Sequence, residues 1–177
     1  MLWQARQGTW LIPRVLAMPA VGFSNIVMTE VVAGYADHQW RYSDFQGGTL
    51  ADNNFRIHRI SNEFIDRFGS SEPIREIRLV GHSARVWRQG GFDARDEDDI
   101  SQKRANEVSA ALARDIIMNP SGHFTPRQLQ AEVESGFLRI LVVGVGARQR
   151  LTTKNNGAAP ENRRVVIELS LTQSIPI

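Results

Sequence analysis

Arginine is the residue type in this sequence with the greatest capacity for ligand chemistry. Of the 21 basic residues, 19 are arginine, and only Lys103 and Lys154 are lysine. A guanidinium can bind a carboxylate or a phosphate through two parallel hydrogen bonds, which a lysine ammonium cannot do. The bias is compatible with an anion-binding site, although a general preference of the genome for arginine codons explains it more simply.

No pattern typical of a catalytic centre or a metal site occurs along the chain. There is no cysteine, which excludes disulfides and cysteine-based zinc sites. The histidines are scattered, at His38, His58, His82 and His123. No two of them have the i, i+4 spacing with which a helix presents a metal. Ser83 follows His82, but adjacent strand residues point to opposite faces, so the two form no catalytic triad.

An apolar run that ends in Gly-x-Gly, from Val142 to Gly146, hints at a dinucleotide site. Such a site needs a third small residue and a helix whose first turn faces the pyrophosphate. Gln149 occupies the third position, and the stretch that follows, with Asn155-Asn156-Gly157 and Pro160, is a poor helix former. We therefore predict no enzyme, no cofactor and no metal.

Composition indicates a single folded domain. The chain has 177 residues, of which 42% are hydrophobic, and a formal net charge of +2. This apolar fraction and this small net charge exclude a disordered chain. The small excess of positive charge also gives no reason to expect nucleic-acid binding.

Residues 1–36 are apolar and rich in glycine and proline, and we predict that they form an N-terminal extension of a domain spanning residues 37–177. Within them, Ile26-Val27-Met28 and Val31-Val32 suit short strands. Trp3 and Trp10 are large apolar side chains that must be covered, either by the domain itself or by a partner protein.

The uncharged run over residues 15–29 is not typical of an export signal or of a membrane-spanning helix. It is interrupted by Pro19 and Gly22, and it is shorter than the roughly 20 apolar residues that a spanning helix needs. We therefore expect no transmembrane segment. Either the protein stays in the cytoplasm, or a leader has been removed before this sequence begins.

Apolar periodicity predicts the elements of the domain. Alternation predicts strands over residues 38–45, 74–83 and 165–171, and an apolar run predicts a buried strand over residues 138–145. Helical spacing predicts helices over residues 53–68, 101–117 and 126–134, the first capped by Asp52 or Asn53 and stopped by Gly69. Long loops are expected over residues 85–99 and 146–162. This βαβαββ-type order indicates an α+β fold, a two-layer sandwich with helices on one face of a mixed sheet.

Four segments resemble, in their order, the motifs of one family. They are Ile77–Ser83 (IRLVGHS), Ile100–Val108 (ISQKRANEV), Val143–Gly146 (VGVG) and Asn162–Ile167 (NRRVVI). The family motifs are a strand ending in GHTD, a helix with LSxxRAxxV, a GxG strand end and NRRVxI. The chain over residues 38–171 therefore resembles the OmpA-like C-terminal domain, shared by outer-membrane protein A, the peptidoglycan-associated lipoprotein and the stator protein MotB.

That resemblance implies a module that binds peptidoglycan through the diaminopimelate residue of its stem peptide. A carboxylate must pair the ammonium of this zwitterion, and an arginine must pair its carboxylate. The resemblance assigns the arginine to Arg104, and to Ser101 the start of a helical turn whose N–H groups add to an anion site. It places Asn162 and Arg163 beside the pocket, and Ser83 in the turn that matches GHTD.

Two positions depart from the family pattern. Ala84 stands where the family has the aspartate that pairs the ammonium, and Glu97 stands where it has an asparagine. The loop between the first two motifs is also longer, and one of its acids could replace the aspartate. The candidates are Asp93, Asp96, Asp98 and Asp99. Outside the family role, Arg104 would form an ordinary exposed ion pair with Asp98, Asp99 or Glu107.

The sequence thus leaves two hypotheses for function, with an enzyme least favoured. In the first, the domain still binds peptidoglycan through Arg104 and a replacement acid, which requires delivery to the periplasm or cell envelope. In the second, the ligand site has degenerated, and the domain is a structural part of a larger envelope or secretion-type assembly. A protein partner would then contact residues 1–36, where the candidate contacts are Trp3, Trp10, Phe23 and Val31.

Overall fold

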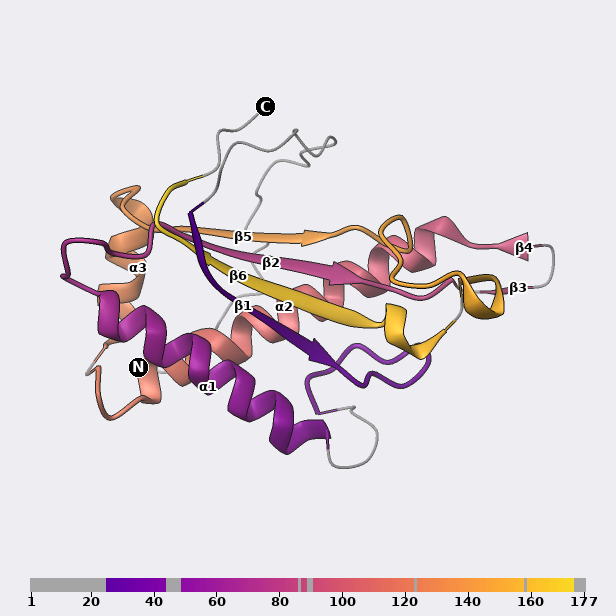
Figure 1. Ribbon diagram of the computed structural model, residues 1–177, viewed down its shortest axis with the longest axis horizontal. Coiled ribbons are helices and arrows are strands. Elements are labelled where there is room, and N and C mark those ends of the chain that lie inside the picture. The colour runs from indigo at the N-terminus through magenta and orange to yellow at the C-terminus, as the bar shows by residue number, and fades with distance from the viewer. Residues whose placement is uncertain are drawn as a thin grey trace.

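The computed structural model describes residues 25–43, 49–85, 87–88, 91–122, 124–157 and 159–173. These residues form a four-stranded sheet, a two-stranded hairpin and three α-helices (Figure 1). The strands are β1 (Ile26–Ala33), β2 (Glu76–His82), β3 (Trp87–Arg88), β4 (Gly91–Phe92), β5 (Arg139–Gly144) and β6 (Arg164–Ser170). The helices are α1 (Thr49–Arg67), α2 (Ala94–Met118) and α3 (Pro126–Glu134). Short 3₁₀ turns cover Lys154–Gly157 and Pro160–Asn162.

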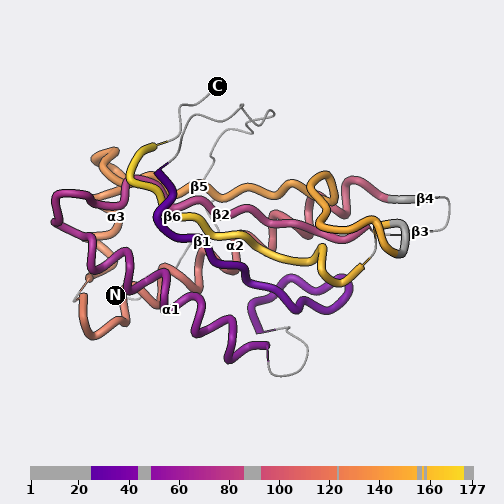
Figure 2. The backbone as a smooth tube through the Cα atoms, viewed as in Figure 1, coloured from indigo at the N-terminus to yellow at the C-terminus, as the bar shows by residue number. Residues whose placement is uncertain are grey.

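The main sheet is mixed, with the strand order β1-β6-β2-β5. Strand β6 is antiparallel to both of its neighbours, whereas β2 and β5 are parallel. Figures 1 and 2 show α1 and α2 on the same side of this sheet. The predicted α+β fold, with two layers and helices on one face of a mixed sheet, is therefore confirmed.

The hydrophobic core lies between the sheet and helices α1 and α2. Ile77 and Leu79 of β2 are buried against this layer, and they pair in register with Leu169 and Ile167 of β6. The helices contribute buried side chains at their predicted spacing, namely Ile57, Ile60, Phe64, Val108, Leu112 and Ile116. The alternation of β2 thus divides the strand into a core face and an opposite face, as the sequence predicts.

The first strand lies at residues 26–33, and the prediction of a strand over residues 38–45 is wrong. Residues 37–43 form turns that lie on α2 instead. The Lys103 ammonium lies 4.9 Å from the centre of the Trp40 ring, and the Tyr42 N–H donates to the Glu107 carboxylate. The alternation of Trp40 and Tyr42 therefore reflects contacts with a helix. Asp44 and Phe45 lie outside the described residues.

Strand β1 falls inside the segment that the sequence predicts to be an extension. It pairs along its length with β6, and Val32 is fully buried. The two short strands expected around residues 26–32 are thus one strand of the sheet, and this domain covers most of its apolar side chains, although Ile26 stays exposed. The half-buried Val31 lies in that strand, while Trp3, Trp10 and Phe23 lie outside the described residues.

Helix α2 begins seven residues earlier than predicted. Asp93 caps it by accepting hydrogen bonds from the N–H groups of Arg95 and Asp96. Asp98 and Asp99 consequently belong to the helix and not to a loop. The rest of the expected loop contains the β3–β4 hairpin, which pairs Trp87 with Phe92. Acidic residues in the first turn of a helix interact favourably with the positive end of its macrodipole, so this long polar stretch is compatible with the start of a helix.

Other predicted helix ends are close to those observed. Gly69 follows α1 with a φ of +74°, a conformation that glycine adopts without strain. Asn53, however, does not cap α1, because the helix already begins at Thr49. Its buried amide instead bonds both backbone groups of Ala33 and so ties α1 to β1. Helix α3 has the predicted bounds, with a capping box formed by Thr125 and Gln128.

Two glycines allow α2 to lie directly on the ends of β2 and β5. A Cβ at Gly81 would overlap the Ser101 carbonyl, and one at Gly144 would overlap the Gln102 backbone.

We predict that Gly81→Ala lowers the free energy of unfolding by about 2–3 kcal/mol or more, because backbone atoms must move apart. Gly69→Ala is the comparison, since a Cβ there meets nothing within 4 Å and only a left-handed conformation, about 1 kcal/mol, opposes it. Urea unfolding measures both, and equal losses would contradict the prediction.

Candidate functional site

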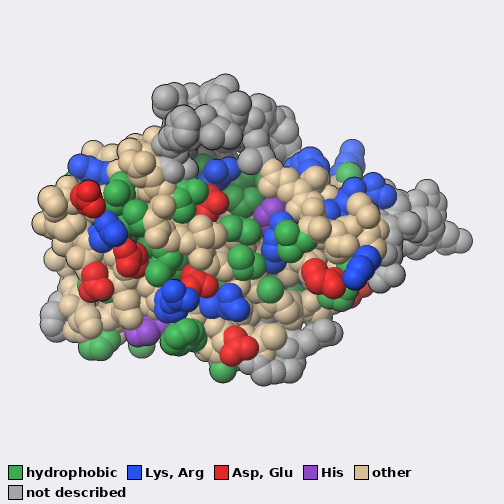
Figure 3. Space-filling view, in the orientation of Figure 1, with side chains coloured by type: hydrophobic (Ala, Val, Ile, Leu, Met, Phe, Trp, Pro, Cys, Tyr) green, Lys and Arg blue, Asp and Glu red, His purple; other side chains and the backbone are tan. Residues whose placement is uncertain are grey.

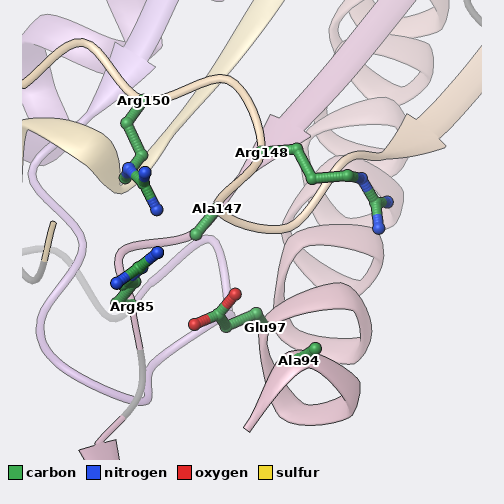
Figure 4. A pocket seen from close by; sticks show the side chains of 6 residues that line it. All are labelled: Arg85, Ala94, Glu97, Ala147, Arg148 and Arg150. Atoms are coloured by element: carbon green, nitrogen blue, oxygen red, sulfur yellow. The ribbon is translucent and has the colours of Figure 1, made fainter. Parts of the chain in front are cut away.

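A cavity of about 370 Å³ opens where β2 and β5 end and α2 begins. Its lining residues are Arg85, Ala94, Glu97, Ala147, Arg148 and Arg150 (Figure 4). Three separate segments therefore supply the walls: the turn after β2, the first turn of α2 and the loop after β5. Open sheets that carry parallel strands commonly place ligand sites at such strand ends.

Ser101 and Gly146 together join the cavity's three segments. The Ser101 hydroxyl donates to the Asp98 carbonyl at 2.8 Å and accepts the Gly146 N–H at 2.9 Å. The Ser83 N–H donates to the Gly146 carbonyl at 3.0 Å, which joins the two strand ends. Ser101 is fully buried, so the structure gives its side chain an internal role. Its predicted place in a ligand site stays a prediction.

Arg104 is among the largest fully buried side chains of the described chain, with 1% of its surface exposed. Its guanidinium donates to three backbone carbonyls: Gln39 at 2.9 Å, His82 at 3.1 Å and Ala36 at 3.5 Å. It also lies 4.8 Å from the centre of the Tyr35 ring. Burial lowers the pKa of Arg104 to about 10, so it remains a cation at neutral pH.

None of the hydrogen-bond partners of Arg104 in the described chain is a carboxylate, and Asp37 acts on it only through its charge. The exposed pair predicted with Asp98, Asp99 or Glu107 is wrong, because these acids have other partners. Asp98 lies 3.1 Å from Arg148, Asp99 lies 2.7 Å from Lys103, and Glu107 accepts the Tyr42 N–H. A buried cation bonded to several carbonyls acts as a cross-link between segments, and here it joins the turns after β1 to the end of β2.

Asn162 and Arg163 directly precede β6. Asn162 is fully buried, and its side chain accepts the N–H groups of Leu151 and Thr152 and donates to the carbonyls of Thr152 and Gly157. Arg163 lies 3.5 Å from the Asp37 carboxylate. Both side chains thus order neighbouring loops, and whether either also contacts a ligand stays a prediction.

His82 and Ser83 carry buried polar atoms with unmet hydrogen-bonding capacity. In the part of the chain that the structure describes, neither His82 Nδ1 nor Ser83 Oγ has a hydrogen-bond partner. Burial, and next the charge of Arg164, lower the pKa of His82 to about 4, although a hydrogen bond to the Gln149 backbone opposes the shift. The imidazole is therefore neutral at physiological pH.

The acid that faces the cavity is Glu97, and none of the four aspartates proposed from the sequence lines it. Asp93 caps α2, while Asp98 and Asp99 pair with Arg148 and Lys103. Glu97 is 9% exposed, and Figure 4 shows its carboxylate and the Arg85 side chain pointing toward one another. The motif alignment marks Glu97 only as a departure from an asparagine.

The three arginines of the cavity were not predicted as site residues. Arg85 follows the segment that matches GHTD, and Arg148 and Arg150 follow the GxG strand end. Their common signal is that each comes within six residues of the end of a strand, and the two strands, β2 and β5, end at the same edge of the sheet. Arg104 does not line the cavity, although Glu97, Ser101 and Arg104 lie on one face of α2 and Ser101 separates the other two.

Comparison with solved structures identifies the fold. The chain is similar to the OmpA-like domain of FopA1 from Francisella tularensis, with a TM-score of 0.50, 18% identity, and coverage of 80% of this chain and 71% of that one. It is also similar to the peptidoglycan-associated lipoprotein from Burkholderia pseudomallei, with a TM-score of 0.49, 14% identity, and coverage of 79% and 89%. The cell wall anchor of the type VI secretion system from Pseudomonas aeruginosa gives a TM-score of 0.47, 15% identity, and coverage of 80% of both chains.

The chain therefore has the fold of an OmpA-like domain, as its motifs indicate. No protein-family model and no curated protein sequence matches it. Among the residues that the structure describes, no helix is long and apolar enough to span a bilayer, and no group of three or more potential ligands could hold a metal ion.

The burial of Arg104 predicts a large contribution to stability. Arg104→Gln should lower the free energy of unfolding by about 2–4 kcal/mol, because it removes charge-assisted hydrogen bonds and leaves buried carbonyls unpaired. Arg114→Gln, which removes the same charge from an exposed position of α2, should change it by less than about 0.5 kcal/mol. If Arg104 were held for a ligand instead, its removal would leave urea stability unchanged or raise it.

The lowered pKa of His82 predicts a dependence of stability on pH. In the unfolded chain the imidazole takes up a proton near pH 6.5, whereas the folded protein resists this until about pH 4. The unfolded state thus binds more protons in that interval, so stability is retained above pH 6.5 and is lost as the pH falls toward 4. Urea unfolding across this window should show a shallower slope for His82→Gln, and an identical slope would contradict the assignment.

Proposed function

We propose that this chain is a non-catalytic OmpA-like domain whose diaminopimelate site has degenerated, and that it serves as a structural or interaction component of a larger assembly. The observation that carries the proposal is the state of Arg104. The side chain that matches the ligand-binding arginine of the family is 1% exposed and bonded to backbone carbonyls.

A zwitterionic ligand needs two opposite charges at its site, and neither is in place. Ala84, which stands for the family's aspartate, is 5% exposed and has no charge to pair an ammonium. Arg104 would have to give up three carbonyls before binding a carboxylate, and those carbonyls would then be buried without partners. Binding would therefore have to compensate the loss of an internal cross-link.

The motifs and the fold support an OmpA-like domain. An interaction role fits a ligand site in which neither of the two required charges is in place. Candidate partner contacts remain those of residues 1–36. The end of this segment forms strand β1, which pairs with β6 in the sheet. The partner-facing role therefore concerns the apolar residues that precede Ile26, which include Trp3 and Trp10.

Glu97 favours a second candidate function, which is peptidoglycan binding at a rebuilt site. Its carboxylate lies in the wall of the cavity, next to arginines that could pair a carboxylate of the same ligand. In this alternative Glu97 takes the place of the missing aspartate, and arginines of the cavity replace Arg104. The domain would then have to be exposed to the cell wall.

Sedimentation with insoluble diaminopimelate-type peptidoglycan tests the proposal. We expect the wild type to stay in the supernatant, together with Arg114→Gln, while a peptidoglycan-associated lipoprotein pellets as the positive control. Pelleting of the wild type would refute the proposed loss of binding. If that pelleting is then abolished by Glu97→Gln but kept by Arg114→Gln, the rebuilt site is the correct reading.

A further inference from the structure

Arg150 differs from the other two arginines of the cavity in its pairing. Arg148 forms an ion pair with Asp98 at 3.1 Å, and Figure 4 shows it directed away from Arg85 and Arg150. The Arg85 side chain faces the Glu97 carboxylate (Figure 4). The guanidinium of the half-buried Arg150, by contrast, makes no hydrogen bond or ion pair with any residue that the structure describes.

Gly157 brings Arg85 and Arg150 together. It has a φ of +87°, and its carbonyl accepts the Arg85 N–H at 3.0 Å. A Cβ at this position would lie 2.8 Å from Cδ of Arg150 and 3.2 Å from Cδ of Arg85, so both side chains lie directly against the glycine. Figure 4 shows the two guanidiniums on the same side of Ala147. Like charges this close repel each other, and an anion between them would relieve the repulsion.

Among the residues that the structure describes, the charges around the cavity leave one cation in excess. Three guanidiniums line it, and the carboxylates of Glu97 and Asp98 face two of them. Figure 3 shows Lys and Arg side chains gathered over this end of the molecule. Ala94, which begins α2, also lines the cavity, so the positive end of the helix dipole faces it.

We propose that this cavity binds the oxyanion group of a small molecule, either a carboxylate or a phosphate, with Arg150 as the principal donor and Arg85 as the second. The volume of about 370 Å³ lies within the range of small-molecule sites, so a ligand larger than a bare ion fits. Neither donor is a residue that the family motifs assign to diaminopimelate, although the cavity is the same one that the alternative, rebuilt wall-binding site would use.

Sodium phosphate and sodium acetate are the probes for this site, because they separate the two oxyanion sources. Each is titrated at an ionic strength matched with sodium chloride, and the arginine Nε–Hε NMR signals are followed. We expect a saturable shift of the Arg150 signal with at least one probe. Arg150→Gln should weaken binding by about tenfold or more, whereas Arg114→Gln should leave it unchanged.

Glu97→Gln gives an independent check with the opposite sign. Removing a carboxylate from the wall should tighten binding of phosphate or acetate several-fold, whereas a site for a zwitterion would lose its ammonium partner. Circular dichroism and urea unfolding of each variant exclude misfolding as a cause. Shifts that equal those with chloride, or binding that Arg150→Gln leaves unchanged, would overturn the proposal. A response to phosphate alone, or to acetate alone, supports it and names the oxyanion.

Discussion

The close approach of α2 to the ends of β2 and β5 is the constraint on which the site depends. It requires Gly81 and Gly144, since side chains there would occupy the space of the helix backbone. The Ser101 hydroxyl then ties the helix to the loop after β5, because it donates to the Asp98 carbonyl and accepts the Gly146 N–H. Because helix and strand ends are fixed in this way, the first turn of α2 and the turns after both strands meet and enclose a cavity.

Arg104, one turn after Ser101 in α2, also ties the helix to neighbouring segments. Its hydrogen bonds gather the chain after β1 and the end of β2 around a single buried cation. A residue of this kind can lose its role in ligand binding and still be needed for the fold. A retained motif is therefore weak support for a retained activity, and the surroundings of the motif decide between the two.

Sequence patterns predicted most of the fold and little of the cavity. Strands β2 and β6 and helix α3 follow from alternation and capping, and β5 follows from an apolar run; all of these are local signals. The run does not show that β5 lies at the edge of the sheet and is only half-buried. The first strand was misplaced because Trp40 and Tyr42 alternate for a reason that lies in another element, α2. Arg85, Arg148 and Arg150 were missed because the turn after β2 and the loop after β5 bring them together, and no spacing in the sequence predicts that these two segments meet.

The hydrogen bonds of Asn162 have a further consequence for the loop that carries Arg150. The buried amide binds Leu151, Thr152 and Gly157, which follow Arg150 in the same loop, so this part of the loop is held in place by the protein itself. A ligand that enters the cavity would therefore bind to residues whose conformational entropy was already lost during folding. Its affinity would be set mainly by desolvation and charge, and would fall steeply with ionic strength.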